Sequence, residues 1–264
     1  NQTIETLFFT VQTGTVVTGD GVIDVDTTWA LNNAPYIIMT SIIVNSGVVL
    51  TIEPGVIVKI GSKDIVIKVN GKIVAEGSQA LPIEFTSVNA TGDSWQKPEI
   101  KFVGNGSSLS YCQFNGLFRI AGGTQTGPGE VDQVTHCSFD SKTSQANQEI
   151  EFKCNQIRYN TFDGAAATFE MISGSSFLYA DNVNTGGSVE VQLRDGTDTA
   201  EIKNNQMTNT GLKVGVEQQT PTLITGNRIE SNSDKDRGLD LNNNKDSVQT
   251  TVEYNTITGW QVGI

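Results

Sequence analysis

Three glutamates recur at nearly equal spacing in this chain, each within a short alternating strand pattern. Glu151, Glu170 and Glu190 are separated by 19 and 20 residues, and apolar residues flank each of them. If each strand lies beside its equivalent in the next repeat, their carboxylates lie about 5 Å apart. Such a row would share a cation, be neutralised by basic residues, or hold one carboxyl protonated, because like charges repel at that spacing. The alternative is an ordinary solvated charged face.

Basic and amide side chains accompany these glutamates in the aligned strands. Acidic, basic and amide groups together can hydrogen-bond sugar hydroxyls and hold uronate groups. The alignment places Arg119, Glu151, Glu170, Glu190, Lys213 and Asp240 in one outward row, with Lys153 and Gln192 in the next row. The predicted ligand-binding residues are these eight together with Arg194.

Three ring side chains form a second candidate site. Tyr111, His136 and Tyr159 hold the same position in three successive repeats. If the rings point outward, they form a platform for sugar rings, and if they point inward, they pack the bend of the repeat. Both interpretations stay open.

A third candidate is an Asn/Asp-rich turn that suggests calcium. Asn232, Asp234 and Asp236 alternate before Gly238 as oxygen ligands do in calcium loops. The central Gly and terminal Glu of an EF-hand are missing, and turns rich in Asn and Asp are also expected on structural grounds.

The cysteines indicate buried thiols or one disulfide. Cys112 and Cys137 occupy the same slot of neighbouring repeats, at a distance that permits a disulfide. Two stacked thiols acting as small hydrophobes are the alternative. With no Cys-x-x-Cys pair and a single His, the chain has no recognisable zinc site.

A repeated unit positions all of these groups. It consists of an apolar residue, two variable residues, an anchor, one further residue and a second apolar residue, as in Ile202, Asn205 and Met207. Seven anchors follow one another at separations of 25, 23, 21, 24, 22 and 28 residues: Cys112, Cys137, Asn160, Asp181, Asn205, Asn227 and Asn255. Periods in this range indicate a solenoid, and alternation with period two indicates strands. Each anchor Asn would bond to the Asn of the next coil.

The unit, with its Asn, polar turn and Gly-apolar-x-apolar strand, resembles the repeats of the pectate-lyase-like superfamily, found in carbohydrate-binding proteins and sugar hydrolases. The run VNSGVVLTIEPGVIVKI at 44–60 resembles the first coils of large secreted β-helix proteins. The predicted fold is therefore all-β, a single-stranded right-handed parallel β-helix of about 22–24 residues per coil. We expect one domain over 1–264, with a strand or cap segment at 1–30 and coils from 31 to 264 that continue beyond the C-terminal residue.

The resemblance implies work on polysaccharides. We expect a polysaccharide-binding or adhesion module without catalysis, whose partner is a polysaccharide or cell-surface glycan. One alternative is a polysaccharide lyase or glycoside hydrolase that uses the Glu/Arg face, and another is a structural stalk. Leu193-Arg-Asp-Gly196 is similar to a strand of alginate and chondroitin lyases, whose Arg pairs with a Lys one coil earlier. Here Lys153 lies two coils earlier, which breaks that pairing.

Composition limits the remaining classes. The formal net charge of −12 argues against binding to nucleic-acid backbones or anionic membranes. No apolar run reaches the 18 residues of a membrane span, so no membrane insertion is expected. The low Lys and Arg content and the surface rich in Thr, Asn and Gly suggest a secreted or cell-surface protein. The chain ends within a strand pattern, so a longer chain or end-to-end pairing is expected there.

Overall fold

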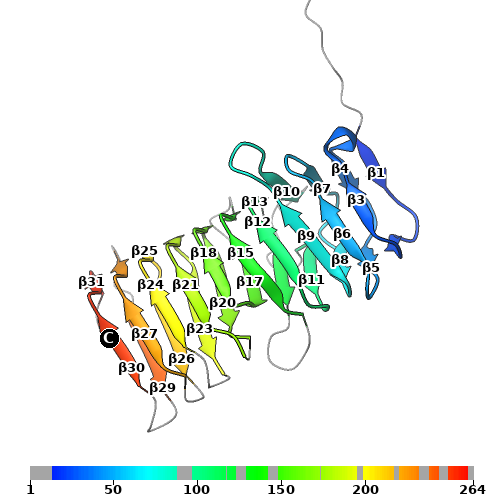
Figure 1. The fold of residues 1–264 in the computed structure, drawn as a ribbon. Helices are drawn as coiled ribbons and strands as arrows, with labels where there is room; N and C mark the ends of the chain where they lie inside the picture. Colours follow the sequence, from blue (N-terminus) through cyan, green and yellow to red (C-terminus); the bar gives the residue numbers. More distant parts are fainter. Residues whose placement is uncertain are drawn as a thin grey trace, which may run out of the picture.

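The chain winds into a parallel β-solenoid whose coils stack along one axis (Figure 1). The computed structural model describes residues 14–87, 97–116, 118–122, 129–141, 148–172, 174–194, 199–216, 220–231, 238–243 and 249–260. Within these ranges, consecutive strands go to three different sheets in turn, and every paired strand is parallel to its partner in the next coil. The predicted right-handed parallel β-helix is confirmed.

Sheet A carries the strand that follows the anchor of each coil. Its strands are β1 (Thr15–Val17), β4 (Tyr36–Ile38), β7 (Ile57–Ile60), β10 (Ile83–Ser87), β13 (Cys112–Asn115), β16 (Ser138–Asp140), β19 (Thr161–Asp163), β22 (Val183–Thr185), β25 (Gln206–Thr208), β28 (Arg228–Glu230) and β31 (Thr256–Thr258).

Sheet B carries the strands that the sequence alignment used for the charged face. Its strands are β2 (Val22–Ile23), β5 (Ile42–Val44), β8 (Val66–Val69), β11 (Glu99–Phe102), β14 (Arg119–Gly122), β17 (Gln148–Lys153), β20 (Ala165–Glu170), β23 (Ser188–Leu193), β26 (Leu212–Val216) and β29 (Leu239–Asn243).

Sheet C completes each coil and leads back to sheet A. Its strands are β3 (Thr27–Trp29), β6 (Val49–Ile52), β9 (Lys72–Glu76), β12 (Ser107–Ser110), β15 (Val131–Thr135), β18 (Gln156–Arg158), β21 (Phe177–Ala180), β24 (Ala200–Lys203), β27 (Thr222–Thr225) and β30 (Thr250–Glu253). The 3₁₀ helix η1 (Leu31–Asn33) joins β3 to β4. No helix among the described residues is long and apolar enough to cross a membrane.

The N-terminal boundary of the coils differs from the expectation. Strands β1, β2 and β3 already pair with β4, β5 and β6, so the segment expected as a strand or cap contains a complete coil. Residues 1–13 lie outside the described residues.

Alternating side chains fill the interior of the solenoid. In sheet A, the rings of Phe85, Phe114, Phe139 and Phe162 stack one coil apart, with centroids separated by 4.8, 4.9 and 5.0 Å. All four are buried. In-register parallel pairing places equivalent side chains directly above one another, so each coil repeats the packing of the previous one.

An asparagine ladder follows the bend between sheets C and A. Asn160, Asn182, Asn205 and Asn227 each donate from Nδ2 to Oδ1 of the next ladder residue at 2.8–3.0 Å, and Asn255 accepts the last of these bonds. Each step spans 22, 23 or, at the end, 28 residues. The ladder side chains also form hydrogen bonds with backbone groups of the buried bend, as predicted.

The anchor of one coil was assigned one residue too early. Asn182, rather than Asp181, occupies the ladder position, and Tyr179 and Asn184 take the flanking inward places. A one-residue slip turns each side chain to the opposite face of a strand. The polar Asn184 in the second apolar slot is the reason why the pattern suggested the wrong register.

Candidate functional site

The charged face of sheet B exists, but its rows differ from the predicted ones. Glu151 pairs in register with Thr168, and Thr168 pairs with Glu190. Glu170 lies in the neighbouring row, between Lys153 and Gln192. The continuous ladder of three glutamates is therefore wrong, and so is the placement of Arg119 in that row, because Arg119 pairs with residues 99 and 149.

The error arises from an alanine-rich strand start. Strand β20 begins at Ala165, directly after Gly164, and buries Ala165, Ala167 and Phe169. Small alanines after a glycine read as a turn, so the sequence alignment started this strand two residues too late. Phe169 consequently lies opposite Phe152, rather than opposite Ile150.

Arg119 is the centre of one group of ion pairs on this face. Its guanidinium nitrogens lie 3.1 Å from Glu99, 3.6 Å from Glu149 and 3.6 Å from Glu151. Lys97 lies 2.9 Å from Glu149 on the same side. The three carboxylates here are thus ion-paired with two basic side chains, close to one of the arrangements that the sequence left open.

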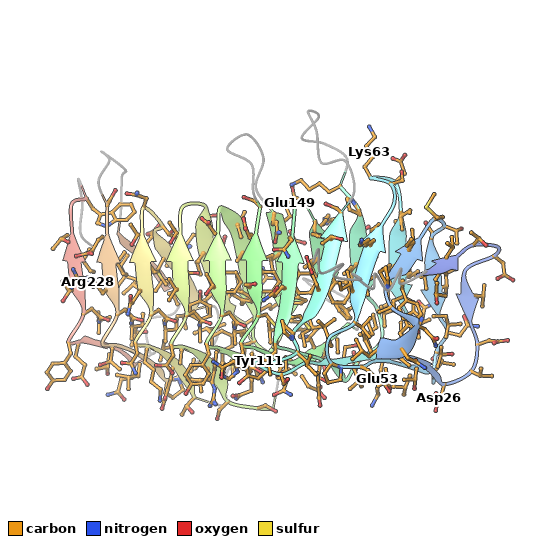
Figure 2. All side chains as sticks on the ribbon, turned by 90° about the horizontal axis from the view of Figure 1, so that it is seen from above. Asp26, Glu53, Lys63, Tyr111, Glu149 and Arg228 are labelled. Carbon is orange, nitrogen blue, oxygen red and sulfur yellow. The ribbon has the colours of Figure 1, made fainter. Side chains whose placement is uncertain are left out.

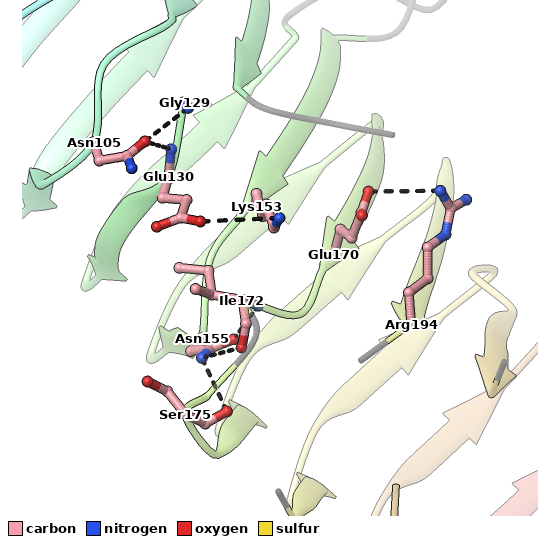
Figure 3. A network of polar contacts seen from close by, with 9 residues as sticks. All are labelled: Asn105, Gly129, Glu130, Lys153, Asn155, Glu170, Ile172, Ser175 and Arg194. Atoms are coloured by element: carbon pink, nitrogen blue, oxygen red, sulfur yellow. Dashed lines mark hydrogen bonds and ion pairs between the residues drawn. The ribbon is translucent and has the colours of Figure 1, made fainter. Parts of the chain in front are cut away.

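The other predicted ligand residues also lie beside charged or polar partners. Lys213 lies 3.0 Å from Glu190, and Gln192 donates to Glu190 at 3.1 Å. Figure 3 shows two further pairs, Lys153 with Glu130 at 3.9 Å and the buried Glu170 with Arg194 at 4.0 Å. Asp240 is in register with Lys213. The face is a set of paired charges rather than an acidic row.

The three cysteines are buried free thiols. Burial raises the pKa of Cys112, and a hydrogen bond with Cys137 raises it further. Burial also raises the pKa of Cys154 to about 12. Thiols held protonated in this way are poor nucleophiles, because the thiolate is the reactive form.

The ring side chains lie on the outside of the bend between sheets C and A. The rings of Tyr111 and His136 stack with centroids 4.4 Å apart, and those of His136 and Tyr159 with centroids 4.8 Å apart. Tyr159 is 45% exposed. The rings therefore point outward rather than into the bend. Figure 2 shows Tyr111 and Glu149 at opposite edges of the solenoid, so the ring stack and the charged face are separate surfaces.

The backbone at these rings is in the left-handed region. Tyr111, His136 and Tyr159 have φ of 49°, 55° and 58°. Later coils place Asp181, Asn204 and Gly226 at this slot, types that adopt this conformation readily, and the last coil again places a tyrosine there, Tyr254 with φ of 55°. For a bulky residue the cost is about 1–2 kcal/mol. Two stacking contacts of about 0.5–1.5 kcal/mol each offset part of that cost for three residues.

A groove of about 400 Å³ runs beside the ring stack. The rings of Tyr111, His136 and Tyr159 form one wall, and Gln113, Ser138 and Thr161 form a polar floor in register on sheet A. Ser78, Gln79 and Pro82 line the remaining part. The side chains of the wall and floor make no hydrogen bond to the described part of the chain, so their polar groups are available to a ligand.

Sequence reasoning missed the floor of this groove. The signal was a tetrapeptide in three successive coils, in which a ring residue, the anchor, a polar residue and a Phe follow one another. It reads Tyr111-Cys-Gln-Phe114, His136-Cys-Ser-Phe139 and Tyr159-Asn-Thr-Phe162. The anchor and the Phe point inward, so the ring and the polar residue share the outer surface.

The calcium candidate at Asn232, Asp234 and Asp236 lies outside the described residues. Within the residues that the structure describes, no three His, Cys, Asp or Glu side chains gather as a metal site would require.

Residues 21–113 match the family described as pectate-lyase like beta helix domain. No curated protein and no solved structure matches the chain. The family match covers the N-terminal coils, and the solenoid continues in the same three sheets to β31.

Proposed function

We propose that this chain binds polysaccharide and serves in adhesion outside the cell or at the cell surface, without catalysis, because its N-terminal coils match the pectate-lyase like family and the chain folds as a parallel β-solenoid. The family match supports a carbohydrate-related role, and the groove beside the ring stack supports binding as the form of that role.

The observation that carries the proposal is the repeated ring and polar pair. Each of three coils presents one ring and one hydrogen-bonding side chain at the groove, at the spacing of the coils. A polysaccharide repeats its hydroxyls along an extended chain, so a surface with a matching repeat can bind several sugars in the same way. Tyr111 and Tyr159 have a backbone strain that Asp181, Asn204 and Gly226 avoid at the same slot, although Tyr254 has it too.

The charged face supports the absence of catalysis. Glycoside hydrolysis by two carboxyls needs one that is protonated and one that is ionised. Glu151, Glu170 and Glu190 instead each lie within 4.0 Å of a Lys or Arg side chain, so the face offers no two carboxyls in clearly different surroundings. Lys153 and Arg194 pair with different glutamates, rather than converging on one place. The ligand role predicted for these residues stays a prediction, which the following assay includes.

The test compares two double variants in a binding assay with a panel of neutral and acidic polysaccharides. Tyr111→Asn with Tyr159→Asn removes two rings at the groove and introduces a residue type that the left-handed backbone favours. Glu190→Gln with Lys213→Gln removes an exposed ion pair without changing the net charge.

We expect the ring variant to lose binding and the charge variant to retain it, while an assay for reducing ends and unsaturated products stays negative. Loss of binding only in the charge variant would place the ligand on sheet B. Product formation by the wild-type protein would support the enzyme alternative, and absence of any binding would support the structural stalk.

A further inference from the structure

We propose that the groove beside the ring stack selects an uncharged glycan and disfavours acidic polysaccharides. This inference rests on the proposed function, because it assigns the class of ligand to the same groove. It states which polysaccharides the groove prefers, neutral or acidic, and binding of one polysaccharide would not show that.

The first argument is the lining itself. The wall and floor contain phenol, imidazole, amide and hydroxyl groups, and none of the described residues that line the groove is Asp, Glu, Lys or Arg. Recognition of a carboxylate or sulfate ordinarily uses Arg or Lys, which bond the anion directly. The guanidinium of Arg158, from β18 in sheet C, lies 5.2 Å from the centroid of the Tyr159 ring, and Arg158 is not among the lining residues.

The second argument is the charge of the surroundings. The next outward row of sheet A, beyond the floor, consists of Asn115, Asp140 and Asp163 in register. Glu84 precedes Gln113 in the row of the floor and accepts a hydrogen bond from Asn115 at 3.0 Å. These carboxylates, on a protein of net charge −12, raise the energy of a polyanion in the groove.

The third argument is the orientation of the rings. Because Tyr111, His136 and Tyr159 stack on one another at 4.4 and 4.8 Å, their inner faces are covered. The groove therefore meets ring edges and polar tips rather than a row of open ring faces. Edges and tips together with Gln113, Ser138 and Thr161 can exchange hydrogen bonds with sugar hydroxyls, which both donate and accept. Uncharged, hydroxyl-rich chains match this lining.

The experiment measures affinity for a neutral polymer, such as galactomannan or mixed-linkage glucan, and for polygalacturonate, at about 20 mM and about 0.5 M NaCl. We expect the wild-type protein to bind a neutral polymer about tenfold or more tightly than polygalacturonate at low salt. The affinity for the neutral polymer should change less than about twofold with salt, because no ion pair forms.

One charge variant sharpens the test. Asp163→Lys reverses a charge at an exposed position beside the floor, outside the lining. We expect it to strengthen polygalacturonate binding at low salt and to leave neutral-polymer binding unchanged. The Tyr111→Asn with Tyr159→Asn variant should lose neutral-polymer binding at both salt concentrations.

The outcomes separate the two proposals. Suppose that the protein binds polygalacturonate more tightly than every neutral polymer and that the ring variant loses this binding. That result would contradict the preference for an uncharged ligand but would still support polysaccharide binding at the groove. No binding of either class would overturn the proposed function itself. Neutral-polymer binding that the ring variant retains would overturn the assignment of the groove.

Discussion

The ring centroids of Tyr111 and His136 lie 4.4 Å apart, with an angle of 11° between the ring planes, although both residues have positive φ. The two residues thus have an unfavourable backbone conformation although their side chains face the solvent. Later coils hold Asp181, Asn204 and Gly226 at this slot, types that favour the left-handed region, and then a tyrosine again, Tyr254. Stacking offsets only part of the backbone cost, and contact with a ligand is the further reason that we propose for these three rings.

The ring stack should contribute little to stability. We expect Tyr111→Asn with Tyr159→Asn to change the free energy of unfolding by less than about 1 kcal/mol, because relief of left-handed strain offsets lost stacking. Urea denaturation measures this, with Phe139→Ala as the control. That control removes a buried stacked ring and should cost about 3–5 kcal/mol. A ring variant as destabilised as the control would mean that the rings serve the fold.

The asparagine ladder should be a main source of stability in the bend. Asn205→Ala removes donors to the Tyr179 carbonyl at 3.1 Å and to Asn227 at 2.9 Å, and should cost about 1–3 kcal/mol. The neighbouring exposed Asn204→Gly keeps the left-handed conformation and should change stability by about 0.5 kcal/mol or less. Equal losses in the two variants, measured by thermal unfolding, would contradict the ladder as the cause.

A buried polar pair offers a stabilising substitution. The Tyr179 hydroxyl donates to Asn184 Oδ1 at 2.8 Å, and Asn184 Nδ2 is buried with no partner in the described part of the protein. Replacing both by Tyr179→Phe and Asn184→Leu should raise the free energy of unfolding by about 1–2 kcal/mol. Asn184→Leu alone should gain less, since it leaves the hydroxyl without its acceptor. A double variant less stable than wild type would show that the pair is needed for packing.

The thiols make stability fall at high pH. An unfolded thiol has a pKa of about 8.5, whereas burial raises the pKa of Cys154 to about 12. The folded state therefore retains a proton that the unfolded state loses above about pH 8.5. This one thiol should lower stability by about 1.4 kcal/mol per pH unit from there toward pH 12. Urea denaturation from about pH 7.5 to 10.5 measures the slope. Cys154→Ala should have a shallower slope by that amount, and identical slopes would contradict a buried neutral thiol.

Much of the fold could be predicted because the interior repeats. The spacing of Asn160, Asn205 and Asn227 gave the coil and the ladder, and the alternation around them gave the inward faces. Register failed where an inward residue was not a large hydrophobe, as at Asn184 and at Ala165 and Ala167. At these residues, packing against the neighbouring coils decides which side chains point inward. The residues of a single coil do not show that packing.

The site was harder to predict because two properties of the backbone determine it. The left-handed conformation before each anchor turns Tyr111, His136 and Tyr159 outward, whereas simple alternation from the neighbouring inward residue suggested packing of the bend. The pairing of charges on sheet B depends on strand register, so the glutamates, although recognised as outward, were assigned the wrong neighbours.

The central claim is that glycan contacts the ring stack, and the single histidine of the chain gives a direct test. His136 lies between the two tyrosine rings, so the ¹H–¹³C signals of its imidazole report on this groove alone. Titration with a neutral oligosaccharide should shift these signals, with a saturation curve whose Kd matches calorimetry. The Tyr111→Asn with Tyr159→Asn variant, which retains His136, should show no shift. A glycan that binds by calorimetry and leaves the wild-type His136 signals unchanged would contradict the account.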